Sequence, residues 1–191
     1  MPIDPKTGEH WVPTYTGKRA VLTRPDKDIL DIRDIAHSLA NICRYVGHTG
    51  THYSVAEHSV WVARAAANKV GPRLRKHALR QGLLHDAPEA YLGDLSRQLK
   101  NLPGIKEAYG HLETLWAKAI HERFYLHVFL QEVKAADKAI WYYESTQLFP
   151  NHTDYWVQED VGMADAFAGI ELGLSAQDAE NLFLAEFMEV F

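Results

Sequence analysis

Two histidines and two aspartates have the residue types and the positions of a metal site. His58 lies at the start of an apolar helical stretch, and His85 and Asp86 follow an apolar pair. Asp137 lies in the middle of a second apolar stripe. An ionised carboxylate is costly to bury unless a cation or hydrogen bonds compensate it. The order His, His-Asp, Asp therefore predicts one divalent ion held by these four side chains.

The ligand types limit which metal the site would take and what it would do. Two imidazoles and two carboxylates suit a borderline divalent ion such as Mn, Fe, Co, Ni or Zn. Four protein ligands leave room on an octahedral ion for a water and a phosphate oxygen. Such an ion polarises a phosphoryl group and lowers the pKa of its bound water. We therefore expect phosphate-ester hydrolysis, with Asp86 in the catalytic centre and Glu89, three residues later, as the group that orients the water or carries its proton.

Each of these residues also has a simpler explanation. His58 alone would be an ordinary helix-surface histidine. Asp86 could cap the next helix, and Asp137 could form a salt bridge with a lysine or arginine. Glu89 could be an exposed carboxylate that the helix dipole favours. Taken together, the four ligands on three helices that should pack against one another favour the metal.

The composition is that of an ordinary globular protein with one domain. The chain has 191 residues, a formal net charge of −5 and one cysteine, Cys43. An acidic chain argues against non-specific binding to nucleic acid. A single cysteine excludes an intramolecular disulfide, and neither a signal peptide nor an apolar run long enough for a membrane span is evident. We therefore expect a cytoplasmic protein with no nucleic-acid or membrane partner.

Hydrophobic periodicity predicts an all-α fold. The spacing predicts helices over 29–45, 54–69, 72–86, 104–124, 128–148 and 175–190, and a weaker helix over 162–172. Loops are expected over 91–103 and 150–159. Residues 1–28 carry four prolines and predict an irregular arm, with a short extended pair around Trp11–Val12 and Ala20–Leu22. The helical domain is expected to span residues 29–191.

Two local patterns give more specific predictions. Ser54 and Glu57 have the spacing of a capping box, in which each side chain accepts the backbone N–H of the other. The apolar stripes place Leu74 and Ala78 on the inner face of one helix, and Ala108 on the inner face of another.

Five segments resemble one known family. They are Asn41–Tyr45, His52–Ser59, His85–Glu89, Gly93–Leu95 with Lys100, and Val133–Asp137. Together they resemble the YfbR-like HD-domain nucleotide phosphohydrolases over about residues 30–145. This group includes bacterial 5′-deoxynucleotidases and compact phage enzymes that split dATP into deoxyadenosine and triphosphate. The resemblance implies an HD-domain helical bundle, metal ligation by His58, His85, Asp86 and Asp137, and Glu89 as the acid/base residue.

The resemblance also implies where the substrate binds. Arg44 and Tyr45 occupy the positions of a basic and an aromatic residue near the substrate. Lys100 matches a lysine that follows the Gly-Asp-Leu turn, and we expect it to meet phosphate. Asp94 is placed to sense the sugar hydroxyls. The alternatives that require no substrate are that Arg44 interacts only with a helix dipole, that Tyr45 packs beside Val46 and that Lys100 is solvated.

Two further segments bear on the choice of substrate. The loop over 47–53, which contains His48, is the expected place for contacts with the base or the phosphates. The deoxynucleotidases have Pro-Thr-Pro after Gly-Asp-Leu, whereas this chain has Ser96-Arg97-Gln98. An additional arginine, Arg97, favours a longer and more negative phosphate chain.

These observations predict an enzyme that hydrolyses 2′-deoxynucleoside 5′-phosphates, with a preference for dATP as a triphosphohydrolase. The first alternative is a 5′-deoxynucleotidase that releases orthophosphate from monophosphates. The second is a helical nucleotide-binding module with a structural metal. Family members that hydrolyse a guanosine alarmone usually carry an acidic pair three and four residues after the His-Asp pair. Here Glu89 is followed by Ala90, so this activity is disfavoured. Magnesium would accompany the substrate phosphates, and the relatives imply a homo-oligomer.

Overall fold

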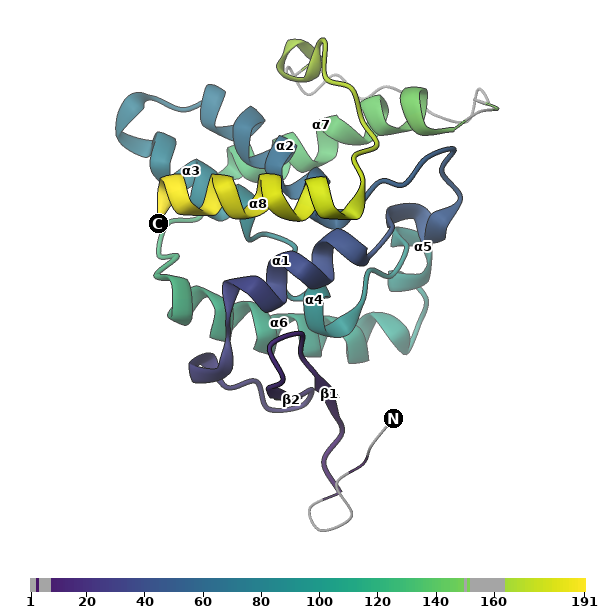
Figure 1. The fold of residues 1–191 in the computed structure, drawn as a ribbon, viewed down its shortest axis with the longest axis vertical. Helices are drawn as coiled ribbons and strands as arrows, with labels where there is room; N and C mark the ends of the chain where they lie inside the picture. Colours follow the sequence, from purple (N-terminus) through teal and green to yellow (C-terminus); the bar gives the residue numbers. More distant parts are fainter. Residues whose placement is uncertain (1–2, 4–7, 150, 152–163) are drawn as a thin grey trace.

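The computed structural model describes residues 3, 8–149, 151 and 164–191, and these residues are mostly helical (Figure 1). The predicted loop over 150–159, except residue 151, and residues 162–163 of the predicted weak helix lie outside the described residues. The α-helices are α1 (Ile32–Asn41), α2 (Val55–Asn68), α3 (Pro72–Leu83), α4 (Glu89–Leu92), α5 (Arg97–Lys100), α6 (Ile105–Phe124), α7 (Gln131–Leu148) and α8 (Ala176–Val190). Within the described residues, 3-10 helices span Lys27–Ile29, Arg44–Gly47 and Ala164–Phe167.

A short antiparallel hairpin precedes the helices. Strands β1 (Trp11–Pro13) and β2 (Arg19–Val21) pair with Trp11 opposite Val21, which confirms the predicted extended pair. The hairpin packs onto the helices: Ala20 is fully buried, and Trp116 of α6 donates its indole N–H to the Leu22 carbonyl. The arm therefore contributes to the core.

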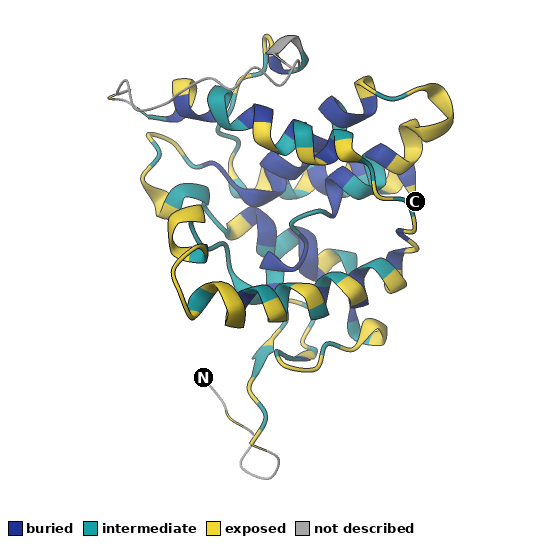
Figure 2. Ribbon diagram, turned by 180° about the vertical axis from the view of Figure 1, so that it is seen from behind, coloured by how far each residue is buried: buried dark blue, intermediate teal, exposed yellow. Residues whose placement is uncertain are grey.

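Helix α2 is the central element of the fold. It contacts α1, α3, α7 and α8 (Figure 1). One apolar cluster joins α2 to α1, α4, α6 and α8, and a second lies between α2, α3 and α7. Figure 2 shows the buried residues gathered along the faces that the helices turn toward one another. A polar side chain on α2 is therefore surrounded by protein on most sides.

The positions of the long helices are largely as predicted, and the main differences are at their ends. The helices predicted over 54–69, 104–124 and 175–190 are confirmed to within one residue. The prediction of 29–45 is too long at both ends, because Asp31 caps α1 and because Cys43 forms an antiparallel bridge with Ser54. The helix predicted over 72–86 ends three residues early, at Leu83. The helix predicted over 128–148 begins three residues late, at Gln131.

Several detailed predictions are wrong. Ser54 does accept the Glu57 N–H, but the Glu57 carboxylate accepts the N–H groups of Gly173 and Leu174 instead of closing a capping box. Leu74 is 41% exposed, and Ala108 is exposed while its neighbour Tyr109 is buried. The described part of the weak helix contains only the 3-10 turn Ala164–Phe167.

The part of the chain that the structure describes contains no helix with both the length and the apolar character that crossing a bilayer requires.

Gly82 fixes how closely α3 approaches α2. A Cβ atom at Gly82 would lie 2.4 Å from the backbone Cα of Ala63, where nothing can move aside cheaply. We expect Gly82→Ala to lower the free energy of unfolding by about 1–3 kcal/mol, the usual cost of overpacking a core. Chemical denaturation would measure this loss. Gly110→Ala is the matched control, since a Cβ there meets nothing within 4 Å, and equal losses in the two variants would contradict the close packing.

Candidate metal centre

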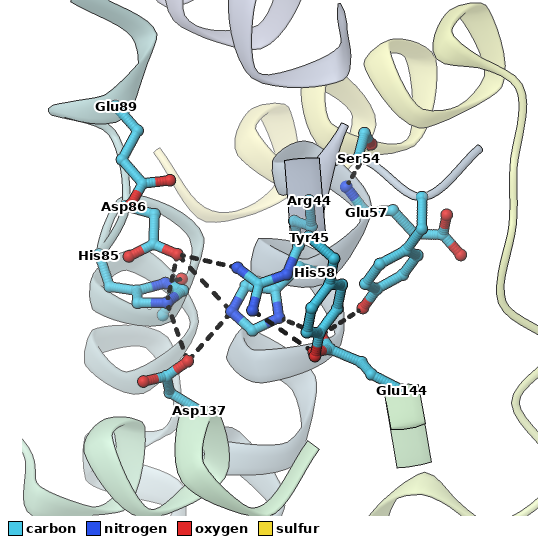
Figure 3. Close-up of polar contacts among 12 residues, drawn as sticks. Arg44, Tyr45, Ser54, Glu57, His58, His85, Asp86, Glu89, Asp137 and Glu144 are labelled. Atoms are coloured by element: carbon cyan, nitrogen blue, oxygen red, sulfur yellow. Dashed lines mark hydrogen bonds and ion pairs between the residues drawn. The ribbon is translucent and has the colours of Figure 1, made fainter. Parts of the chain in front are cut away.

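Three helical segments bring the four predicted ligands together (Figure 3). His58 lies in the first turn of α2, which Ser54 caps. His85 and Asp86 lie in the turn after α3, and Asp137 lies in the second turn of α7. Because α2 packs against both α3 and α7, residues distant in sequence face one another.

The ligand atoms lie within the range that one ion could bridge. One nitrogen of each ring and one oxygen of Asp86 lie within 4.8 Å of one another. Asp137 Oδ1 lies 3.1 Å from His58 Nε2 and 3.8 Å from His85 Nε2. The structure thus contains a possible metal-binding triad of His58, His85 and Asp86, and Asp137 adjoins it.

The other nitrogen of each ring is already bound, which fixes the direction of the lone pairs. His58 Nδ1 lies 2.6 Å from the Glu144 carboxylate, and His85 Nδ1 lies 2.7 Å from the Gly82 carbonyl. A carboxylate and a carbonyl only accept, so both Nδ1 atoms carry hydrogen and the Nε2 atoms are the positions left for a metal. Both Nε2 atoms face carboxylate oxygens: His58 Nε2 lies 3.1 Å from Asp137 Oδ1, and the buried His85 Nε2 lies 3.1 Å from Asp86 Oδ2. These residues fit a divalent metal.

The ionisation of the cluster also suits a cation. Burial opposes charge on Asp86, yet His85 and His58 hold the pKa of this carboxyl at about 2. Burial likewise opposes charge on the His85 ring, but Asp86 and Asp137 raise its pKa well above the ordinary value. The carboxylates therefore attract a positive charge, which protons supply in the absence of a metal. A metal must displace those protons, so its affinity should fall at low pH.

The simpler explanations for these residues are not borne out. Helix α4 has no side-chain cap, so Asp86 does not cap it. Asp137 pairs with the two imidazoles rather than with a lysine or arginine. His58 is fully buried and is not a surface histidine, and Glu89 is only 4% exposed.

The cluster opens on one side into a cavity of about 660 Å³. The side chains of Asp86 and Asp137 are 22% and 37% exposed and line this cavity, whereas His58 is fully buried behind them. A structural metal site is closed by protein ligands, while a catalytic site keeps open positions. The cluster has the open arrangement.

All the residues predicted to bind substrate line the same cavity. They are Arg44, Tyr45, His48, Asp94, Arg97 and Lys100. His48 and Arg97 are exposed at it, and Asp94 is half-buried.

Arg44 and Tyr45 lie on the turn that follows α1 rather than at a helix end. Arg44 Nη2 lies 3.4 Å from Glu144 Oε2, and its Nη1 lies 3.7 Å from Asp86 Oδ2. The Tyr45 hydroxyl donates to Glu144. A helix-dipole interaction and simple packing beside Val46 therefore do not explain these two residues.

Lys100 is bound by acids and is not simply solvated. Its Nζ lies 2.7 Å from Glu89 Oε1 and 3.1 Å from Glu113 Oε1. Glu89 is nearly buried, and burial, followed by the charges of Asp86 and Asp94, raises its pKa to about 8 despite Lys100. A carboxyl that titrates near neutrality is suited to proton transfer.

Relatives match the chain over most of its length. No family model matches it. It is 30% identical over 182 residues to the uncharacterized protein YfdR of Escherichia coli strain K12, an alignment that covers 94% of this chain and 95% of YfdR. The chain belongs to the YfdR family. An uncharacterized protein of Rhodobacter capsulatus is 40% identical over 137 residues, which cover 66% of this chain and 67% of that protein.

In this member of the YfdR family, two acids near the cluster have no role in the sequence prediction. Glu144 bridges His58 to the Arg44–Gly47 turn, and Glu113 shares Lys100 with Glu89. Glu144 lies seven residues after Asp137 and therefore two helical turns along the same face. That spacing could have identified Glu144, whereas nothing in the local sequence marks Glu113.

Proposed function

We propose that this protein is a metal-dependent phosphohydrolase that acts on 2′-deoxynucleoside 5′-phosphates. The preferred substrate is a deoxynucleoside triphosphate such as dATP, which it splits into deoxynucleoside and triphosphate. One observation carries the proposal: two imidazoles and two carboxylates from three helices converge beside a cavity that basic side chains line. The order of these ligands supports assignment to the HD-domain bundles of the YfbR-like type.

His58, His85, Asp86 and Asp137 would hold the metal. When bound, a divalent ion supplies charge stabilisation for the phosphoryl group and a water of lowered pKa. The residues fit Mn, Fe, Co, Ni or Zn, because imidazole and carboxylate together suit borderline ions. Since Asp86 and Asp137 face the cavity, a phosphate oxygen in the cavity can reach the exposed side of the cluster.

Glu89 is the residue that holds and moves the proton. It lines the cavity beside Asp86, and one of its oxygens, Oε2, is buried without a hydrogen bond. When the carboxyl is ionised, this oxygen can accept a proton from the attacking water. Lys100 holds the other oxygen and so fixes the direction of the carboxylate.

The cationic side chains of the cavity suit a chain of phosphates. Arg44 lies next to Asp86, and Arg97 is exposed farther along the cavity wall. Arginine binds phosphate oxygens through two parallel hydrogen bonds, so two arginines can span more than one phosphate. Asp94, in the same wall, would accept from a sugar hydroxyl.

Product analysis tests this proposal. We expect the protein, stripped of metal by a chelator and then supplied with Mn or Co, to release intact triphosphate and nucleoside from dATP. Orthophosphate from monophosphates would instead favour the 5′-deoxynucleotidase. If no deoxynucleoside mono-, di- or triphosphate is hydrolysed with any of the five metals, the hydrolase is excluded and a structural metal in a nucleotide-binding module remains.

A further inference from the structure

A buried carboxylate, that of Glu144, joins the metal centre to the turn that carries Arg44 and Tyr45 (Figure 3). Glu144 is fully buried on α7. Its Oε1 accepts from His58 Nδ1 at 2.6 Å and from the Tyr53 hydroxyl at 2.9 Å. Its Oε2 accepts from the Tyr45 hydroxyl and from Arg44 Nη2 at 3.4 Å. Oε1 thus binds the proposed metal ligand His58, and Oε2 binds Arg44 and Tyr45 on the substrate side of the cavity.

The turn that Glu144 holds has an unfavourable backbone. Tyr45 and Val46 have φ values of 57° and 56°, in the left-handed region, and Val46 is 71% exposed. A β-branched residue in that region is strained and needs a compensating interaction. Val46 gains no burial, so contacts of its neighbours must hold the turn. These are the backbone bonds from Arg44 to Tyr53 and from His48 to Tyr45, together with the side-chain bonds of Arg44 and Tyr45 to Glu144.

We propose that Glu144 is a positioning residue that couples metal binding to the order of the Arg44–Gly47 turn. This inference rests on the metal centre of the proposed function. A bound ion on His58 Nε2 strengthens the bond from Nδ1 to Glu144, and the second oxygen is then fixed for Tyr45 and Arg44. By linkage, an ordered turn must increase metal affinity by the same factor.

Glutamine at position 144 separates this role from simple packing. An amide has the same shape, but it presents one acceptor and one donor where the carboxylate presents two acceptors. Arg44 can only donate, whereas the imidazole of His58 can accept at Nδ1. The amide nitrogen should therefore face His58, which moves the ring hydrogen to Nε2 and removes a metal ligand.

Titration of the metal-free full chain with Co or Mn, followed by calorimetry, gives the first test. We expect Glu144→Gln to weaken metal binding by about 10- to 100-fold, as loss of a group that orients a ligating histidine usually does. Glu186→Gln is the matched control, because Glu186 is also buried but is bound by Arg64 away from the centre, at 2.9 Å. We expect the control to bind metal as tightly as the wild type.

Tyr45→Phe tests the coupling separately. It removes the Tyr45 bond to Glu144, so that only the longer Arg44 bond joins Glu144 to the turn, and it leaves the bond between His58 and Glu144. Hydrogen exchange of the segment over 44–48 is measured with and without metal, in the absence of nucleotide. We expect metal to slow this exchange clearly less in Tyr45→Phe than in the wild type, because only the Arg44 bond to Glu144 remains, although that variant still binds metal. If Glu144→Gln does not fold, the comparison of wild type with Tyr45→Phe alone tests whether metal binding orders the turn.

The outcomes distinguish this inference from the proposed function. If the wild type binds none of Mn, Fe, Co, Ni and Zn, the proposed function fails, and the inference fails with it. If the wild type binds metal but Glu144→Gln binds it equally well, or metal leaves the exchange of the wild-type turn unchanged, only the coupling role of Glu144 is overturned.

Discussion

Replacing Asp137 with asparagine is expected to lower turnover by about 10³-fold or more. Asparagine keeps the shape of the side chain but removes the charge that faces both His58 Nε2 and His85 Nε2. A catalytic metal ion usually contributes several kcal/mol of charge stabilisation, and each 1.36 kcal/mol corresponds to a tenfold change in rate. Measurement of kcat with dATP at saturating Mn, alongside metal affinity, checks this expectation.

The thermal response to metal separates a ligand from a structural ion pair. A metal that binds only the folded state stabilises it by about 2.7 kcal/mol at a concentration 100 times its Kd. We expect added Co to raise the Tm of the wild type and of Asp28→Asn, but to have little effect on Asp137→Asn. Asp28 is an exposed aspartate of the 3-10 helix Lys27–Ile29 and does not line the cavity. A salt-bridge role would instead give a less stable Asp137→Asn protein with an unchanged response to Co.

The sequence predicts most helices because their apolar stripes are long and regular. It fails where tertiary contacts end a helix early. Apolar spacing continues past Asn41, yet the chain becomes extended there so that Cys43 can pair with Ser54. The bridge and the left-handed residues beyond it depend on partners elsewhere in the chain, and local periodicity carries no information about them.

The direction of a helix face is also predicted less well than the helix itself. Successive residues are about 100° apart around a helix, so an error of one position rotates a stripe by more than its half-width. This explains why the apolar spacing predicts that Ala108 faces inward although Tyr109 is the buried residue. Leu74 lies in the first turn of α3, where neighbouring helices no longer cover it.

The candidate ligands are predictable because burying a charge inside an apolar stripe costs free energy, which only a cation or hydrogen bonds can offset. The same argument applies to Glu144, but its burial is compensated by donors from separate segments, including Arg44, Tyr53 and His58. The sequence shows the cost of burying an acid and does not show what compensates it. For Glu144 the compensation is a network of hydrogen bonds, and for the four ligands we propose a metal.

Replacing Glu89 with glutamine is expected to lower kcat by about 10²- to 10⁴-fold, the usual contribution of a group that transfers a proton. Metal affinity should change little, because Glu89 is not among the proposed ligands. The glutamine carbonyl can still accept from Lys100, which limits disturbance of the site. A fall in metal affinity as large as the fall in kcat would contradict a role in proton transfer.

The pH dependence of stability gives a second, independent test of Glu89. Burial, with Asp86 and Asp94, raises the pKa of Glu89 from 4.5 to about 8, so folding favours its protonated form. This stabilisation is fully present below about pH 4.5 and is lost as the pH rises through about 8. A neutral glutamine does not ionise, so we expect metal-free Glu89→Gln to gain stability relative to the wild type as the pH rises.

A bound cation would lower the pKa of Glu89 and reduce this difference, so the melting temperatures are measured on the metal-free protein across this pH range. If the difference in Tm does not change with pH, Glu89 is not the buried carboxyl that titrates near neutrality, and the basis for its role in proton transfer is lost.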